Sequence, residues 1–242
     1  MFYDAEISEN PSVVLIHGSW LGGWSWREVA NQLAAKGYRV LAPTLTGLGE
    51  RKHLLTGDIN LSVHIEDIVN LILFENITNV VLVGHSYGAM VAAGAADRLF
   101  DRVSCDIVIV DGFITDTGES VVDHYPEVYS LMQHYLSSNP SLVEPPPVAT
   151  FGLNDTEISA AITPLLTRMP LLTHTEKLNY SLDKQAQMSR SYICCMEFPM
   201  FHQTASEAAE HGWRSFEISA GHLAPLTHPK QIAELIIASI HS

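Results

Sequence analysis

The sequence has little cysteine, little positive charge and no long apolar run. Its three cysteines, Cys105, Cys194 and Cys195, are odd in number and two of them are adjacent. Neither a disulfide framework nor a zinc site of the usual spacing is therefore expected. The chain has 13 lysines and arginines against 27 aspartates and glutamates, a net charge of −14. This charge argues against a nucleic-acid partner or binding to an anionic membrane surface. No apolar stretch reaches the length of a membrane span.

Apolar residues are plentiful and make up 47% of the 242 positions. This is enough for one α/β domain with a full core. The first residues, 1–7, lack the basic flank and the apolar centre of a secretory leader, and with the cysteine usage this favours a cytoplasmic enzyme. The expected partner is a small-molecule substrate, and a homodimer is left open.

Apolar runs alternate with amphipathic stretches along the chain. The runs, rich in β-branched residues, predict buried strands at 12–16, 38–42, 80–83, 106–110, 191–196 and 214–218. Helical spacing predicts helices at 27–36, 61–74, 89–96 and 229–240. Strands and helices that alternate in this way favour an α/β fold with a mostly parallel, doubly wound sheet and right-handed crossovers.

This alternation stops soon after the strand that ends at Val110. Residues 114–189 contain helical patches and three consecutive prolines but no clear strand. We interpret them as a helical cap over the open end of the sheet, because sites in such sheets lie beyond the carboxyl ends of the strands. Helices on the back of the sheet are the alternative. The predicted organisation is a core of 1–113 and 190–242, interrupted by a cap at 114–189.

A candidate nucleophile follows the strand at 80–83. Gly84-His85-Ser86-Tyr87-Gly88 is a G-x-S-x-G pattern between a strand and a helix, which is the context of a nucleophile elbow. Such a turn is sharp, so small residues are needed at both glycines, where backbones crowd. The turn raises the Ser86 hydroxyl to the open end of the sheet.

Two backbone N–H groups are candidates for an oxyanion hole. The Tyr87 N–H lies at the start of the helix and can face a developing oxyanion. The second donor should come from the loop after the first strand, where Ser19 is the better candidate and Trp20 the second. Trp20, His85 and Phe113 are candidates for the substrate pocket, with plain packing as the alternative.

A serine hydroxyl is a weak nucleophile and needs a base, and the elbow fold orders its partners as serine, acid, histidine. Among 12 histidines, His222 lies in a short loop directly after the last strand and is the expected base, with His228 as its competitor. Asp111, at the end of the strand 106–110, is the favoured acid. Glu197, after the strand 191–196, is the alternative acid. A turn or helix-capping role is the other interpretation of Asp111.

Taken together, these residues resemble the α/β-hydrolase fold superfamily, from Ser12 to the C-terminal helix. Several segments are similar to a bacterial esterase branch that is related to plant methyl esterases and hydroxynitrile lyases: His-Gly-Ser-Trp at 17–20, Gly-Gly-Trp at 22–24, Thr-Leu-Thr-Gly-Leu-Gly-Glu-Arg at 44–51, the elbow at 84–88, and Tyr-Ile-Cys-Cys-Met-Glu-Phe-Pro at 192–199. The resemblance implies an α/β-hydrolase core and a triad of serine, histidine and an acid.

The resemblance departs from the plant pattern at the acid. In the plant relatives the acid follows the strand equivalent to 191–196, and the matching position here is Phe198. This makes the position after the preceding strand, Asp111, more attractive. The lyase chemistry is not implied, because no lysine lies beside the late acid position to bind a nitrile.

The sequence therefore predicts a serine hydrolase that cleaves a small, mainly apolar carboxylic ester through an acyl-enzyme, without a metal or an organic cofactor. An amide, carbamate or lactone could be cleaved by the same triad. A cofactor-free lyase or dioxygenase, or a ligand receptor without catalysis, are further alternatives on the same fold.

Overall fold

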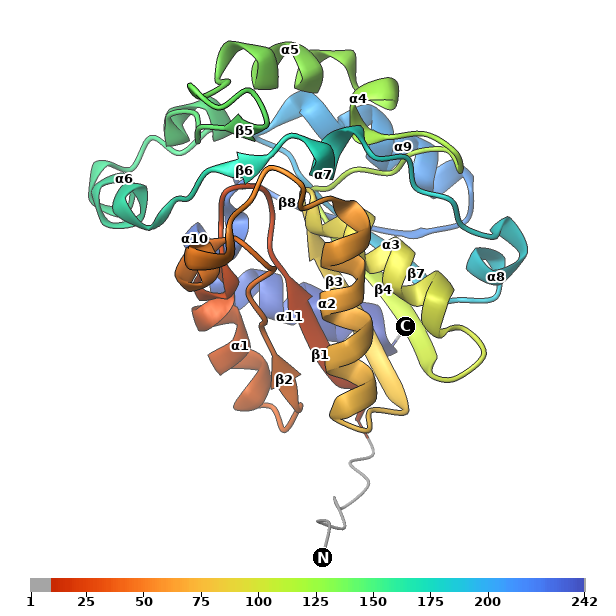
Figure 1. The fold of residues 1–242 in the computed structure, drawn as a ribbon. Coiled ribbons are helices and arrows are strands. Elements are labelled where there is room, and N and C mark those ends of the chain that lie inside the picture. Colours follow the sequence, from red (N-terminus) through yellow and green to blue (C-terminus); the bar gives the residue numbers. More distant parts are fainter. Residues whose placement is uncertain (1–9, 242) are drawn as a thin grey trace, which may run out of the picture.

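A parallel sheet of six strands forms the centre of the molecule (Figure 1). The computed structural model describes residues 10–241. The expectation that the chain has no secretory leader concerns residues 1–7, which lie outside the described residues. The two ends of the predicted core, 1–9 and 242, lie outside them as well. The strand order is β2-β1-β3-β4-β7-β8, and neighbouring strands are parallel. The strands are β1 (Ser12–Ile16), β2 (Val40–Leu41), β3 (Asn79–His85), β4 (Ser104–Val110), β7 (Arg190–Cys195) and β8 (Arg214–Ile218). The predicted α/β class and its parallel sheet are confirmed.

Helices cover both faces of the sheet (Figure 1). α1 (Arg27–Ala34) and α11 (Pro229–His241) pack on one face, and α2 (Leu61–Phe74), α3 (Gly88–Leu99) and α9 (His202–Glu210) on the other. Shorter helices are α10 (Ala224–Thr227) and the 3-10 helices at Gly23–Trp26, Gly49–Leu54 and Pro199–Phe201. No helix in the described part of the chain combines the length and the apolar character that a membrane crossing requires.

The hydrophobic core has two layers, one on each face of the sheet, because side chains alternate along a strand. Successive side chains of β1 point to opposite faces of the sheet. Val13 and Leu15 pack with residues of α1 and α11, whereas Val14 and Ile16 pack with residues of α2 and α3. All four side chains are fully buried, so the central strands read as continuous apolar runs.

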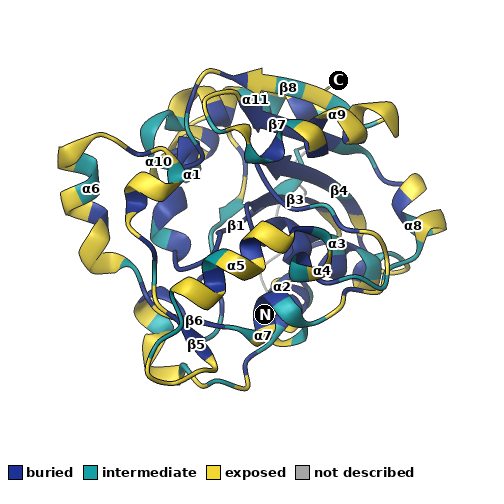
Figure 2. Ribbon diagram, turned by 90° about the horizontal axis from the view of Figure 1, so that it is seen from above, coloured by how far each residue is buried: buried dark blue, intermediate teal, exposed yellow. Residues whose placement is uncertain are grey.

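Most of the segment between β4 and β7 lies above the carboxyl ends of the strands, whereas its last part, 181–189, runs down beside α3 (Figure 1). Figure 2 looks down on the upper part, whose longer helices are largely exposed. We refer to residues 114–189 as the proposed cap. It contains α4 (Val121–His124), α5 (Pro126–His134), β5 (Leu142–Val143), a 3-10 helix (Val148–Phe151), α6 (Thr156–Ile162), a 3-10 helix (Thr163–Leu165), β6 (Met169–Pro170), α7 (Leu172–Thr175) and α8 (Leu182–Ala186). β5 and β6 form an antiparallel pair. These two strands were not predicted, because two residues are too few to show a period.

The three cysteines lie in the core. Cys105, Cys194 and Cys195 are buried and unpaired. Burial raises the pKa of the Cys194 thiol to about 11, so this thiol is protonated at neutral pH and is a poor nucleophile.

Candidate active site

The turn between β3 and α3 places Ser86 in a strained backbone conformation. Its φ is +53°, in the left-handed region that residues other than glycine rarely occupy. The Ser86 N–H donates to the Val110 carbonyl (3.2 Å) and the Ser86 carbonyl accepts from the Ala89 N–H (3.1 Å). These bonds hold the turn in place, with its side chain at the carboxyl end of the sheet.

Close backbone packing explains the two glycines of this turn. A Cβ at Gly84 would lie 2.5 Å from the Gly88 carbonyl oxygen. A Cβ at Gly88 would lie 2.4 Å from the carbonyl oxygen of Ile16. Both distances are far below van der Waals contact, so the crowding expected from the sequence is present at both positions.

Asp111 and His222 are joined by a short hydrogen bond. The His222 Nδ1–H donates to Asp111 Oδ2 over 2.6 Å, and Asp111 Oδ1 accepts the Cys195 N–H over 3.0 Å. Asp111 is completely buried and has a φ of +47°. Because Nδ1 carries the proton, the Nε2 of a neutral His222 has a free lone pair and can accept a proton.

Glu197, the alternative acid, and His228, the alternative base, do not line the cavity that contains Ser86 and His222. Glu197 is exposed and lines a separate surface hollow with Asn154 and His228. The His228 Nδ1 is bonded to Thr227 Oγ1 over 2.8 Å. The structure therefore brings Asp111, and not Glu197, to His222. Asp111 follows β4, which lies next to β3, the strand that leads to Ser86.

Aromatic rings surround His222. Phe198 stacks on the imidazole, with ring centroids 4.7 Å apart and planes at 30°, and Phe201 stacks at 5.5 Å and 25°. The His85 Nε2–H donates to the His222 carbonyl over 2.8 Å. Burial and the neighbouring His222 hold the pKa of His85 well below its usual value, so His85 is neutral. Phe198 lies three residues after the end of β7, and no motif in the sequence marks either phenylalanine as a neighbour of the base.

Ser86 and His222 line one small cavity together with Ser19, Trp20 and His85. The rest of its lining is almost wholly apolar: Gly18, Leu21, Pro145, Val148, Phe151, Leu166 and Leu223. The cavity offers about 20 Å³ to a water-sized molecule, which is roughly the room that one water needs. Within residues 10–241, the Ser86 hydroxyl has no hydrogen-bond partner. Catalytic hydrogen bonds are often long before a substrate binds.

Two of the three expected pocket residues lie at this cavity. Trp20 and His85 line it. Phe113 does not: its ring packs edge-on against Tyr125, with centroids 5.0 Å apart, and against Phe201, at 5.1 Å. Phe113 therefore contributes to the packing behind the site.

The loop after β1 passes directly beside the nucleophile. A Cβ at Gly18 would lie 2.9 Å from the Ser86 Cβ. The N–H groups of Ser19 and Tyr87 donate to no other backbone group in the described ranges. Tyr87 precedes the first turn of α3, where the helix dipole favours negative charge. The two groups are thus free to bind an oxyanion.

His17 ties this loop to the one after β2. Its Nδ1–H donates to the Gly18 carbonyl over 2.9 Å, and its Nε2 accepts the Leu45 N–H over 3.1 Å. The second bond requires the neutral ring, because a protonated Nε2 cannot accept. Burial lowers the pKa of His17 to about 4, which keeps the ring neutral at physiological pH.

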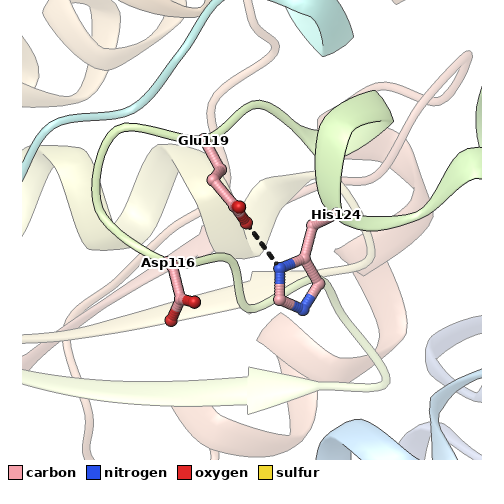
Figure 3. A group of neighbouring side chains, drawn as sticks. All are labelled: Asp116, Glu119 and His124. Carbon is pink, nitrogen blue, oxygen red and sulfur yellow. Dashed lines mark hydrogen bonds and ion pairs between the residues drawn. The ribbon is translucent and has the colours of Figure 1, made fainter.

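One group of potential metal ligands lies outside the cavity, at the beginning of the proposed cap (Figure 3). Among the residues that the structure describes, Asp116, Glu119 and His124 place ligand atoms within 4.8 Å of one another. His124 Nδ1 is already bonded to Glu119 over 2.7 Å. The side chains of this pair are 30% and 39% exposed. This bond already occupies two of the three groups, and we assign the cluster no role.

The fold is matched by known proteins. The family model described as alpha/beta hydrolase family matches residues 13–235. A carbendazim hydrolyzing esterase from Nocardioides sp. (strain SG-4G) is 43% identical over 114 residues, which are 47% of this chain and 47% of that protein. Methylesterase 8 from Arabidopsis thaliana is 39% identical over 108 residues, which are 44% of this chain and 39% of that protein. The matched stretch thus spans less than half the length of these relatives.

A solved structure matches along almost the entire chain. It is an extracellular alpha/beta-hydrolase from a Paenibacillus species, described as sharing structural and functional homology with tobacco salicylic acid binding protein 2. It has a TM-score of 0.84 and 27% identity, and the match covers 96% of this chain and 100% of that one.

Proposed function

The chain belongs to the alpha/beta hydrolase family, and from this premise we propose that it is a serine hydrolase that cleaves a small, mainly apolar carboxylic ester. The observation that carries the proposal is the 2.6 Å bond from His222 Nδ1 to the buried Asp111, together with the cavity that His222 shares with Ser86. The similarity to proteins named as an esterase and a methylesterase supports ester cleavage.

The proposed reaction begins at Ser86. His222 Nε2 takes the proton of the Ser86 hydroxyl as its oxygen attacks the ester carbonyl, and Asp111 stabilises the imidazolium that forms. The N–H groups of Ser19 and Tyr87 bind the oxygen that becomes negative in the tetrahedral intermediate.

The second half of the reaction regenerates the serine. The intermediate collapses, the alcohol leaves with the proton from His222, and an acyl group remains on Ser86. Water, activated by His222, then attacks this acyl-enzyme and releases the acid. No metal or organic cofactor takes part in any of these steps.

The proposed preference for an apolar substrate rests on the lining of the cavity. Its side chains are apolar except for Ser19, Ser86 and two histidines, and it contains no lysine or arginine. A carboxylate or phosphate on the substrate would find no charged partner there and would lose its hydration.

Short p-nitrophenyl esters test the proposal. We expect Ser86→Ala to lower kcat by about 10⁴-fold or more, because the nucleophile is lost while binding remains. The matched control is Ser130→Ala, which changes an exposed serine of α5 and should leave turnover unchanged. Undiminished turnover in Ser86→Ala would refute the mechanism.

A substrate panel separates the alternatives. Amides, carbamates and lactones can be cleaved by the same three side chains, so the ester assignment predicts the highest kcat/KM on esters. A fluorophosphonate should label Ser86 in all of these hydrolases. Turnover that survives this labelling would indicate lyase or dioxygenase chemistry with His222 alone.

A further inference from the structure

His174 contacts both residues that we propose as oxyanion donors. It lies in α7 of the proposed cap and is 1% exposed. Its Nε2 is 3.0 Å from the Ser19 Oγ. Its ring stacks on the ring of Tyr87, with centroids 4.8 Å apart and planes at 20°. The sequence analysis gave this histidine no role.

The neighbouring hydrogen bonds fix the proton positions on His174. The Thr173 hydroxyl donates its only proton to the Pro170 carbonyl over 2.6 Å. It must therefore accept the bond from His174 Nδ1, 2.9 Å away, so Nδ1 carries the proton. Burial lowers the pKa of His174 to about 3. The ring is then neutral, its Nε2 is an acceptor, and the Ser19 hydroxyl donates to it.

Tyr87 is held at a second point by another buried histidine. The His64 Nε2–H donates to the Thr46 carbonyl over 2.9 Å, so the His64 Nδ1 accepts from the Tyr87 hydroxyl, which is 2.9 Å away. Tyr87 is fully buried. Its ring is thus fixed at the tip by His64 and on one face by His174, which restricts the peptide unit that carries its N–H.

The backbone at Ser19 needs a tether of this kind. Ser19 lies beyond the end of β1, outside any helix or strand. The next residue, Trp20, has a φ of +62°, a conformation that costs about 1–3 kcal/mol for a residue other than glycine and persists only where the surroundings enforce it. The bond from the Ser19 hydroxyl to His174 supplies a side-chain anchor beside this strained residue.

We propose that His174 is a positioning residue that holds the two backbone donors of the oxyanion hole, Ser19 N–H and Tyr87 N–H, in their working geometry. The inference rests on the proposed function. Because the oxyanion exists only in the intermediate and its transition states, loosening these donors lowers kcat and leaves KM nearly unchanged.

Two amide substitutions test the role of the outer nitrogen. In His174→Gln the amide oxygen reaches the place of Nε2 and can accept from Ser19. In His174→Asn the shorter amide reaches only the place of Nδ1, and the Ser19 hydroxyl loses its partner. We expect the Asn variant to lower kcat on p-nitrophenyl esters about ten- to a hundredfold, less than the loss of an entire donor, with KM within about threefold. The Gln variant should recover most of this loss.

Equal losses in the two variants, or a loss confined to KM, would overturn the proposal. If a variant at 174 does not fold, as thermal unfolding would reveal, Ser19→Ala breaks the same bond from the other side. It should reproduce the kcat loss, and combining it with His174→Asn should add little, because both remove one contact. Fully additive losses would contradict the proposal.

A second readout does not depend on activity. Nitrogen-15 NMR of the imidazole in the wild-type protein should show His174 as a neutral ring protonated on Nδ1 between about pH 5 and 8, whereas a free histidine titrates in that range. The opposite tautomer, or titration near the ordinary value, would refute the proposal. Failure of the proposed function appears separately, as turnover that persists in Ser86→Ala.

Discussion

Replacing Asp111 by asparagine tests how the buried carboxylate directs His222. The carboxylate accepts two bonds, from the Cys195 N–H over 3.0 Å and from the His222 Nδ1–H over 2.6 Å. An asparagine keeps its oxygen on the Cys195 N–H and therefore turns its amide N–H toward His222. Nδ1 must then accept, the proton moves to Nε2, and the ring can no longer take a proton from Ser86.

The expected loss in kcat is about 10⁴-fold, the size found when the wrong tautomer is imposed in a serine–histidine–aspartate triad. This corresponds to about 5 kcal/mol of transition-state stabilisation. The assay is steady-state hydrolysis of a p-nitrophenyl ester, with circular dichroism to show that the variant folds. KM should change little, because Asp111 is completely buried and does not line the cavity.

Glu197→Gln is the matched control for this experiment. It makes the same chemical change at the alternative acid, which is exposed, and it should leave kcat within about twofold, as surface substitutions usually do. The reasoning would be refuted if Asp111→Asn retained more than about a tenth of the wild-type kcat, or if Glu197→Gln caused the larger loss.

Three further outcomes follow from the same contacts. The free energy of unfolding should fall as the pH drops from the ordinary histidine value of 6.5 to about 4, because His17 and His174 bind protons in the unfolded chain but resist them when folded. Urea titrations should show a shallower fall for His174→Gln, and an unchanged slope would contradict the neutral state assigned to the buried His174 ring. Gly88→Ala should destabilise the protein by about 2–4 kcal/mol in urea, since its Cβ would lie 2.4 Å from a carbonyl oxygen. Gly212→Ala, where a Cβ meets nothing within 4 Å, should cost about 1 kcal/mol for its positive φ, and equal costs would refute the packing argument. Dialysis against EDTA should leave ester hydrolysis unchanged, and a loss restored by a divalent cation would contradict the metal-free mechanism.

The four central strands could be predicted from the sequence because they are largely buried on both faces. Such strands are long apolar runs, and residues 80–83 and 106–110 are examples that the structure places within β3 and β4. β2 is shorter than predicted, Val40–Leu41 instead of 38–42, since it lies at the edge of the sheet and pairs only with β1. The strands of the proposed cap have two residues each, which is too short for any periodic signal.

Site residues were harder to predict from the sequence where they depend on contacts between segments that are far apart in the chain. Asp111 was found because a carboxylate directly after an apolar strand is unusual, and its strand β4 is the neighbour of β3, which leads to Ser86. His174 gave no such signal. It lies 155 residues from Ser19 in the chain, in a one-turn helix, and only the three-dimensional packing brings the two together.

The most direct test of the central claim is to look for the acyl group on Ser86. The enzyme is quenched in acid during turnover of a p-nitrophenyl ester, digested, and examined by mass spectrometry. The account predicts that the peptide containing Ser86 gains the mass of the acyl group, and that this gain is absent in Ser86→Ala. Continued turnover with no acylated peptide, or the label on another residue, would contradict it.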